Sequence, residues 1–193
     1  MKIVLASKSG VRKKILEENN IDAEIIVSDV DEEQVKEALL ATGATPLIIS
    51  KNLAELKSIK VSRKHQDRFV LGADSVVSLN NKLINKPKSR EEALEILKKL
   101  NNSKHYLISS VCISKNGSMI WNYTDKAALT MKDVSDKELK EYLSKITDEA
   151  LYAYNVYQIE GEGRSLFSKI QGDEDTIMGL PVKKIKDYLR NFK

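Results

Sequence analysis

The central stretch of the chain reads Phe69-Val70-Leu71-Gly72-Ala73-Asp74-Ser75-Val76-Val77. Its apolar and β-branched residues predict a buried strand that is interrupted at Asp74 and Ser75. Farther along the chain, two β-rich runs at 106–114 and 118–130 meet at Asn116-Gly117, a strong hairpin signal. Before the central stretch, short apolar runs alternate with helical patterns. This order predicts a mixed α/β fold.

The other predicted elements extend this pattern in both directions. They are strands at 3–6, 24–27 and from 166, and helices after Gly10, at 33–41, at 45–57, after Ser89, at 139–146 and after Pro181. A capping box, Ser135-x-x-Glu138, precedes the helix at 139–146. No Pro- or Gly-rich linker divides the chain, so we expect residues 1–193 to form one domain, which can be bilobal.

Composition excludes several classes of protein. The 193 residues include 32 Lys plus Arg and 28 Asp plus Glu, and this net charge of +4 is too weak a field to indicate nucleic acid. Cys112 is the single cysteine, which excludes a disulfide framework and indicates a reducing compartment. No run approaches the roughly 20 apolar residues of a membrane span. We therefore expect a cytoplasmic protein with neither nucleic acid nor membrane as partner.

Asp74 is the most informative residue, because it places a carboxylate inside a strand that should be buried. Burial of a lone charge is costly unless the charge is paired or binds a cation. Two interpretations stand side by side. One is a structural ion pair or a strand-end Asp, and the other is a metal ligand or general base.

Two further regions could bind phosphate. The segment Ser7-Lys8-Ser9-Gly10 joins a strand to a helix that begins with Arg12 and Lys13, and such a helix N-terminus can cradle phosphates. It is not a Walker loop, and a solvated basic helix face is the alternative. Lys86, before Pro87, and Lys57, on an apolar helical face, are further cations, although either could be solvated.

These pieces occur in the order that is found in the Maf family of nucleoside triphosphate pyrophosphatases, which the chain resembles. The matching motifs are Leu5-Ala6-Ser7-x-Ser9-x-x-Arg12, Asp31-Glu32, Leu53-Ala54-x-x-Lys57, Gly72-Ala73-Asp74-Ser75-Val76-Val77, Lys86-Pro87, Tyr157-x-Ile159-Glu160-Gly161-x-Gly163 and Gly179-Leu180-Pro181. The resemblance implies an elongated, two-lobed, mixed-sheet fold with a central cleft, similar to inosine triphosphatases. It also implies hydrolysis of an NTP to NMP and pyrophosphate in nucleotide-pool housecleaning, with Mg²⁺ or Mn²⁺ as cofactor, by a homodimer.

The resemblance also assigns roles to residues of this chain. Asp74 and Glu32 are expected to hold the metal, and Asp74 to accept a proton from the attacking water. Lys57 and Lys86 complete the expected catalytic set, and Arg12 is expected to grip two phosphate oxygens at once. The expected substrate-binding residues are Ser7, Ser9, Arg12, Lys13, Ser75 and Glu160.

Three departures from the family pattern leave the preferred base open. Gly10 and Val11 replace the usual Pro-Arg of the S-x-S-P-R-R loop, and the segment 172–181 lacks the usual aromatic residue. Glu160 stands where the pyrimidine-selective group has Gln and resembles the methylated-guanine group instead. An alternative is a nucleotide-binding regulator of cell division with little or no catalysis. A phosphoribosyl- or nucleic-acid-handling protein is a further rival, supported only by the basic pI.

Overall fold

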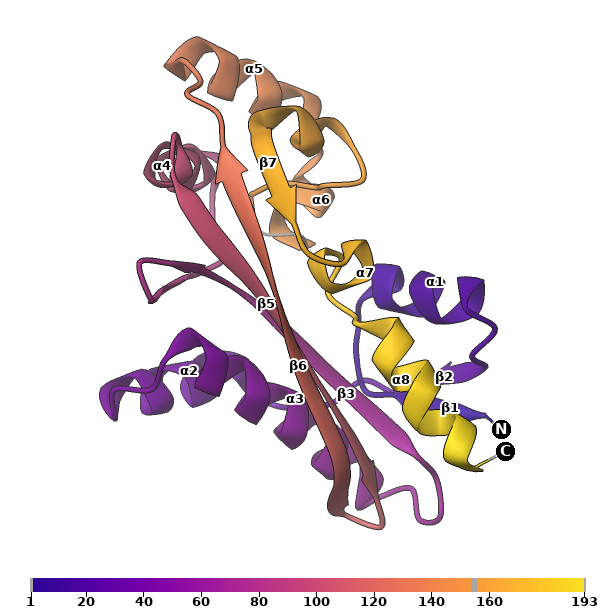
Figure 1. Cartoon of the computed structure of the whole chain (residues 1–193). Coiled ribbons are helices and arrows are strands. Elements are labelled where there is room, and N and C mark those ends of the chain that lie inside the picture. The colour runs from indigo at the N-terminus through magenta and orange to yellow at the C-terminus, as the bar shows by residue number, and fades with distance from the viewer. Residues whose placement is uncertain (1, 154–155, 193) are drawn as a thin grey trace.

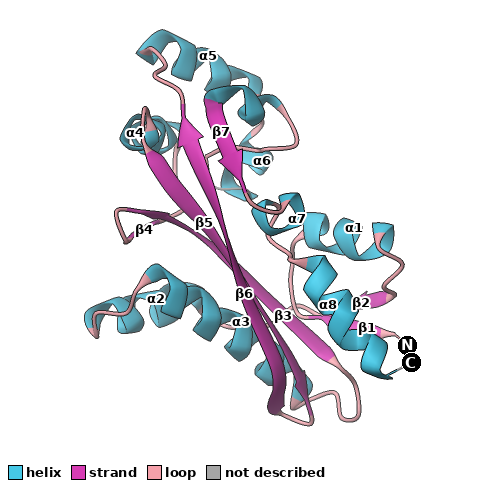
Figure 2. Cartoon of the chain, in the orientation of Figure 1, coloured by secondary structure: helices cyan, strands magenta, loops and turns pink. Residues whose placement is uncertain are grey.

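The computed structural model describes residues 2–153 and 156–192 and contains a seven-stranded mixed sheet (Figures 1 and 2). The strands are β1 (Ile3–Leu5), β2 (Ala23–Ile25), β3 (Val70–Leu79), β4 (Lys82–Ile84), β5 (Lys104–Lys115), β6 (Ser118–Met131) and β7 (Phe167–Gln171). Their order is β2-β1-β3-β5-β6-β7, with β4 paired to β3. β1 is parallel to β2 and β3, and all other pairs are antiparallel. The predicted mixed α/β fold is confirmed.

Helices cover both faces of the long strands (Figure 1). The helices are α1 (Gly10–Glu18), α2 (Glu32–Ala41), α3 (Pro46–Ser62), α4 (Arg90–Leu100), α5 (Asp136–Lys145), α6 (Asp148–Ala153), α7 (Glu174–Ile177) and α8 (Val182–Leu189), with 3₁₀ turns at Glu162–Leu166 and Arg190–Phe192. α2 and α3 lie on one side of β3, β5 and β6, and α1 and α8 lie on the other side. Among the described residues, no helix has the length and apolar character needed to cross a membrane.

Helix starts follow the local signals in the sequence. Ser9, Asp31, Ser89 and Ser135 each cap a helix by accepting a backbone N–H bond, and Ser135 forms the predicted capping box with Glu138. The helix predicted for 45–57 continues to Ser62. The short helices α6 and α7 were not predicted, because four to six residues are too few to show a helical period.

The predicted interruption of the central strand is wrong. β3 runs unbroken from Val70 to Leu79, and Asp74 and Ser75 are paired in register with Ser110 and Ser109 of β5. The strand continues because the backbone of Asp74 keeps its ladder position while its side chain meets a cation from α3.

Gly72 determines how closely α3 approaches the sheet. A Cβ at this position would lie 2.1 Å from the Ala54 carbonyl oxygen and 2.7 Å from the Ser58 backbone nitrogen. Only glycine permits this contact between a helix backbone and a strand. Residues 72 and 74 share one face of the strand. The close approach therefore brings Lys57, which precedes Ser58, over Asp74.

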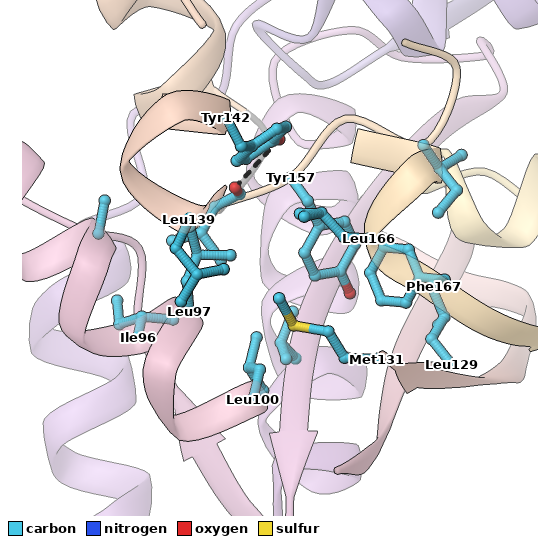
Figure 3. Close-up of a cluster of buried hydrophobic side chains, with 14 of the residues drawn as sticks. Ile96, Leu97, Leu100, Leu129, Met131, Leu139, Tyr142, Tyr157, Leu166 and Phe167 are labelled. Atoms are coloured by element: carbon cyan, nitrogen blue, oxygen red, sulfur yellow. Dashed lines mark hydrogen bonds between the residues drawn. The ribbon is translucent and has the colours of Figure 1, made fainter. Parts of the chain in front are cut away.

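Two main hydrophobic clusters are formed by elements that lie toward opposite ends of the long strands in Figure 1. The larger cluster joins α4 and α5 to β5, β6 and β7, and contains Leu97, Leu139, Tyr157 and Phe167 (Figure 3). The second joins α1 and α8 to β1, β3 and the far end of β5. The polar residues of β3 lie between these two apolar regions, which leaves room for a cavity.

Candidate active site

A cavity of about 630 Å³ opens beside the middle of β3. Its size suits a nucleotide-sized ligand. Of the ten predicted site residues, nine line it, namely Ser7, Ser9, Arg12, Glu32, Lys57, Asp74, Ser75, Lys86 and Glu160. They come from the loop between β1 and α1, from α1, α2, α3 and β3, and from later loops, so the fold gathers residues that are far apart in sequence.

Lys57 holds two carboxylates together at the floor of the cavity. Its Nζ lies 2.8 Å from Asp74 Oδ1 and 3.0 Å from Glu32 Oε1. The Lys57 and Asp74 side chains are only 7% and 6% exposed, whereas Glu32 is 44% exposed. Asp74 is therefore neither a strand-end residue nor a lone buried charge, but the buried half of a short ion pair.

Across residues 2–153 and 156–192, the second oxygen of Asp74 is the one buried carboxylate oxygen without a hydrogen-bond partner. Asp74 Oδ2 has no hydrogen bond to any of the described residues. An unpartnered buried acceptor is costly in a structural ion pair, and it is suited to a water molecule or a cation. The ion pair with Lys57 matches the structural interpretation of Asp74, and the second oxygen is an acceptor that the functional interpretation requires.

The donor set fits a hard divalent cation. Asp74 and Glu32 offer carboxylate oxygens, and Mg²⁺ is commonly bound by one or two carboxylates together with substrate phosphates. Within residues 2–153 and 156–192, no group of three or more His, Cys, Asp and Glu residues is placed to hold a metal alone. Substrate oxygens would therefore have to complete the coordination.

Burial and neighbouring charges both shift the pKa values of the ionisable groups in the cavity. For Glu32, burial alone would raise the pKa, but the charge and hydrogen bond of Lys57 together with the charges of Lys36 and Lys86 outweigh it, so the pKa lies below its usual value. For Lys86, burial and then the charge of Arg12 lower the pKa. Burial also lowers the pKa of Arg12, against the opposing charges of Asp74 and Glu32. Burial therefore disfavours the charged forms of Arg12 and Lys86, whereas the neighbouring lysines favour the charged form of Glu32.

We expected the Arg12 guanidinium to bind two phosphate oxygens at once, but most of its N–H groups donate to other parts of the protein. Its Nε donates to the Gly179 carbonyl at 3.0 Å, and Nη1 donates to the Ala73 carbonyl at 3.0 Å and to Ser7 Oγ at 3.2 Å. Nη2 donates to Ser75 Oγ at 3.0 Å. Four of the five guanidinium N–H groups therefore bond within the described part of the chain. One N–H on Nη2 remains for a phosphate oxygen.

The predicted serines support this arrangement. Ser9 Oγ accepts the Arg12 backbone N–H as the helix cap, and Ser7 Oγ accepts the Ser9 backbone N–H. Both hydroxyls shape the loop at the start of α1, whose residues 7–10 line the cavity, and a helix N-terminus of this kind can bind anions.

Two loop residues lie elsewhere. The tenth predicted residue, Lys13, does not line the cavity, and its exposed side chain pairs with Glu17 at 3.5 Å. Val11 packs against the second hydrophobic cluster. The departure from the family loop at this position therefore contributes to the core.

Sequence reasoning missed some cations that line the cavity. Lys8 and Lys36 both do so. Lys36 stands four residues after Glu32 on α2, and this spacing on one helix face was a signal that could have identified it. Lys8 lies in the phosphate-cradling loop but carried no distinguishing pattern of its own.

The far end of the cavity is apolar with an acidic rim. Leu107, Tyr157 and Ile159 line its wall, and Glu149 and Glu160 are exposed at its edge. An apolar wall with a few polar groups suits an aromatic base. The cations suit the phosphates of a nucleotide, and the apolar wall with its acidic rim suits the base.

Comparisons with known proteins agree with this geometry. The sequence profile of a family described as Maf-like protein matches residues 2–192. A nucleoside triphosphate pyrophosphatase of Pelagibacter ubique (strain HTCC1062) is 69% identical over 191 residues, which are 99% of this chain and 98% of the relative. A 7-methyl-GTP pyrophosphatase of Brucella abortus biovar 1 (strain 9-941) is 37% identical over 100% of this chain and 97% of its own length.

Solved structures share the fold. A HAM1 protein from Coxiella burnetii has a TM-score of 0.58 at 12% identity, covering 99% of each chain. The Staphylococcus aureus Ham1 protein has a TM-score of 0.52 at 14% identity, covering 100% of each chain. At this level of identity the likeness concerns the fold alone.

Proposed function

Because this chain belongs to the Maf-like protein family, we propose that it is a nucleoside triphosphate pyrophosphatase, which hydrolyses an NTP to NMP and pyrophosphate. The observation that carries the proposal is the Lys57–Asp74 pair, with Asp74 Oδ2 left unpartnered in a cavity rich in cations. A buried acceptor of this kind can take a proton from water, and the cations can receive the phosphates.

In this mechanism, water attacks the α-phosphorus and its proton passes to Asp74. The bond from the α-phosphorus to the bridging oxygen breaks, and pyrophosphate leaves with the electron pair. Lys57 keeps Asp74 in position, Lys86 stabilises the charge on the departing group, and the remaining N–H of Arg12 binds a phosphate oxygen both before and during the reaction. Loop N–H groups near Ser9 bind phosphate oxygens.

Asp74 and Glu32 would hold the divalent cation, Mg²⁺ or Mn²⁺. When bound, such a cation neutralises part of the negative charge of the triphosphate. The unpartnered Asp74 Oδ2 and the accessible, half-exposed Glu32 support this assignment.

A purine substrate, with a methylated guanine as the first choice, suits the far end of the cavity. Glu160 can accept two N–H bonds from a guanine edge, whereas a pyrimidine carbonyl facing it would be repelled. Alkylation at N7 makes guanine cationic, and Glu149 lies on the same rim as Glu160. The Brucella relative, named for 7-methyl-GTP, adds support.

We also propose a cellular location and an oligomeric state for the enzyme. It acts in the cytoplasm as a homodimer on free nucleotides, and it binds neither nucleic acid nor membranes. A buried, unpaired Cys112 agrees with a reducing compartment. Sedimentation of the purified chain measures the oligomeric state.

The test is a turnover panel of NTPs that includes UTP, dTTP, GTP and 7-methyl-GTP, each with Mg²⁺ and with Mn²⁺. NMP and pyrophosphate should appear together, and orthophosphate as the first product would contradict attack at the α-phosphorus. Asp74→Asn should lower kcat by about 10²–10⁴-fold while nucleotide still binds.

The matched control is Asp133→Asn, which changes an exposed loop carboxylate in the same way and should keep the parent rate. A chain that binds nucleotides and turns none over would favour the regulator instead. Salt-dependent RNA or DNA binding without hydrolysis would favour the nucleic-acid rival.

A further inference from the structure

The position of the Arg12 side chain depends on a segment whose sequence departs from the family motif. Its Nε bond goes to the carbonyl of Gly179, which has a φ of +96° and packs so closely that a Cβ would lie 2.9 Å from Ser75 Oγ. The position of the guanidinium therefore depends on how segment 173–181, which runs from Asp173 through α7 to Pro181, is docked on the sheet.

A line of hydroxyl groups links Arg12 to α7. Ser109 Oγ lies 2.7 Å from the Thr176 carbonyl oxygen, and because a carbonyl only accepts, Ser109 donates its proton there. Ser109 then accepts from Ser75 Oγ at 2.9 Å, and Ser75 in turn accepts from Arg12 Nη2 at 3.0 Å. Ser75 Oγ also lies 3.4 Å from the Gly179 carbonyl oxygen, a longer contact. The proton direction along Arg12–Ser75–Ser109–Thr176 is thus fixed by its last member.

The series of hydrogen bonds continues from Thr176 to Asp125 on β6. Thr176 Oγ1 donates to Asp125 Oδ2 at 2.7 Å, and the Lys126 backbone N–H donates to Asp125 Oδ1 at 2.9 Å. Both carboxylate oxygens are therefore occupied, which fixes the plane of the carboxylate. Thr176 is fully buried, and neither Thr176 nor Asp125 lines the cavity.

We propose that Thr176 and Asp125 are positioning residues that hold the Arg12 guanidinium toward the phosphates of the substrate. Their bond anchors α7 to β6, and the anchored segment presents the Gly179 carbonyl and the Thr176 carbonyl to the two ends of the Arg12 network. The inference rests on the proposed function and adds two residues that touch no substrate. Arg12 needs this support because four of its five N–H groups serve as structural bonds.

Thr176→Val removes the hydroxyl and keeps the shape of the side chain. We expect KM for the preferred NTP to rise about tenfold while kcat stays within about threefold, because Arg12 binds phosphates in both ground and transition states. A purely structural defect would act differently, since a smaller folded fraction lowers apparent kcat and leaves KM unchanged. Thr176→Ser, which restores a hydroxyl, should return KM to near the parent value.

Two comparisons assign the effect to Arg12. In an Arg12→Met background, Thr176→Val should add no further rise in KM, because interacting residues are non-additive. Lys183→Met is the matched control, since it removes the exposed ion pair of Lys183 with Asp173 at the start of the same segment. It should keep the parent KM, and an equal rise there would show general loosening of the segment and overturn the proposal.

Calorimetry with inorganic triphosphate separates this inference from the proposed function. The parent should bind it, and Thr176→Val should weaken binding about tenfold. Triphosphate binding without NTP turnover would refute the proposed function, and the Thr176→Val affinity would still decide the positioning role. Unchanged affinity in Thr176→Val, additive losses with Arg12→Met, or no triphosphate binding by the parent would each overturn the inference.

Discussion

His105 should make the stability of the fold depend on pH. The ring is fully buried at the start of β5, where Nε2 lies 2.9 Å from the Tyr157 hydroxyl oxygen, and Nδ1 has no hydrogen-bond partner among the described residues. Burial lowers the pKa of His105 from 6.5 to about 4, with the backbone of Ser103 opposing it. The rings of Tyr157 and Phe167 lie 5.6 Å and 5.8 Å from the His105 ring, centroid to centroid. Both aromatic residues belong to the larger cluster (Figure 3).

The sign follows from proton binding. Between pH 6.5 and about 4, the unfolded chain takes up a proton at His105 that the folded chain does not, so the free energy of unfolding falls as pH falls. The full effect is roughly 3 kcal/mol, because one pKa unit corresponds to about 1.4 kcal/mol. About 2 kcal/mol of this should be lost between pH 7 and pH 5.

Urea unfolding followed by circular dichroism at pH 7 and pH 5 measures the effect. His105→Gln removes the titrating group, so its free energy of unfolding should fall by about 2 kcal/mol less than that of the parent over this range. Tyr157→Phe is the matched control, because it removes the same hydrogen bond and keeps the histidine, and it should retain the parent pH dependence. Equal pH dependence in the parent and His105→Gln would refute the argument.

Two other substitutions test the close packing and the base end. Gly72→Ala should lower the free energy of unfolding by about 3 kcal/mol, measured by urea unfolding, because its Cβ would meet the backbone of α3. Gly10→Ala, whose Cβ would have no neighbour within 4 Å, should cost almost nothing, and an equal loss would contradict the packing argument. Glu160→Gln should lower kcat/KM for 7-methyl-GTP about tenfold relative to GTP, since a charged acceptor is replaced by a neutral one. Glu162→Gln, which lies outside the cavity lining, should leave that ratio unchanged, and the same change in both variants would count against Glu160 as a base contact.

Local signals in the sequence predicted much of the fold. The helix start at Ser89, the capping box at Ser135 and Glu138 and the hairpin at Asn116-Gly117 depend on neighbouring residues, and the structure contains all of them. The interruption predicted at Asp74 was wrong because it assumed a lone charge. Lys57, which pairs with Asp74, lies on another element, and only the three-dimensional packing at Gly72 brings the two together.

The site was predicted as a set of residue types and positions, and less well as a set of contacts. Motif spacing identified Arg12 as a cation, yet the acceptors that surround it lie up to 167 residues away in sequence. Lys13 has the same charge one position later, but helix geometry turns it to solvent beside Glu17. Adjacent residues on a helix face different directions, and composition cannot separate them.

Segment 173–181 bears on whether a departure from a family motif implies lost activity. The missing aromatic residue in this segment was one reason to weigh a regulator without catalysis. In the structure the segment is anchored at the Asp173–Lys183 ion pair, at the Thr176–Asp125 hydrogen bond and at the bond from Arg12 to the Gly179 carbonyl. Packing of an aromatic ring and a buried polar anchor are different ways to hold the same backbone, and a motif comparison registers only the first. The altered segment therefore still supports Arg12, and the turnover of NTPs, rather than the motif, decides between enzyme and regulator.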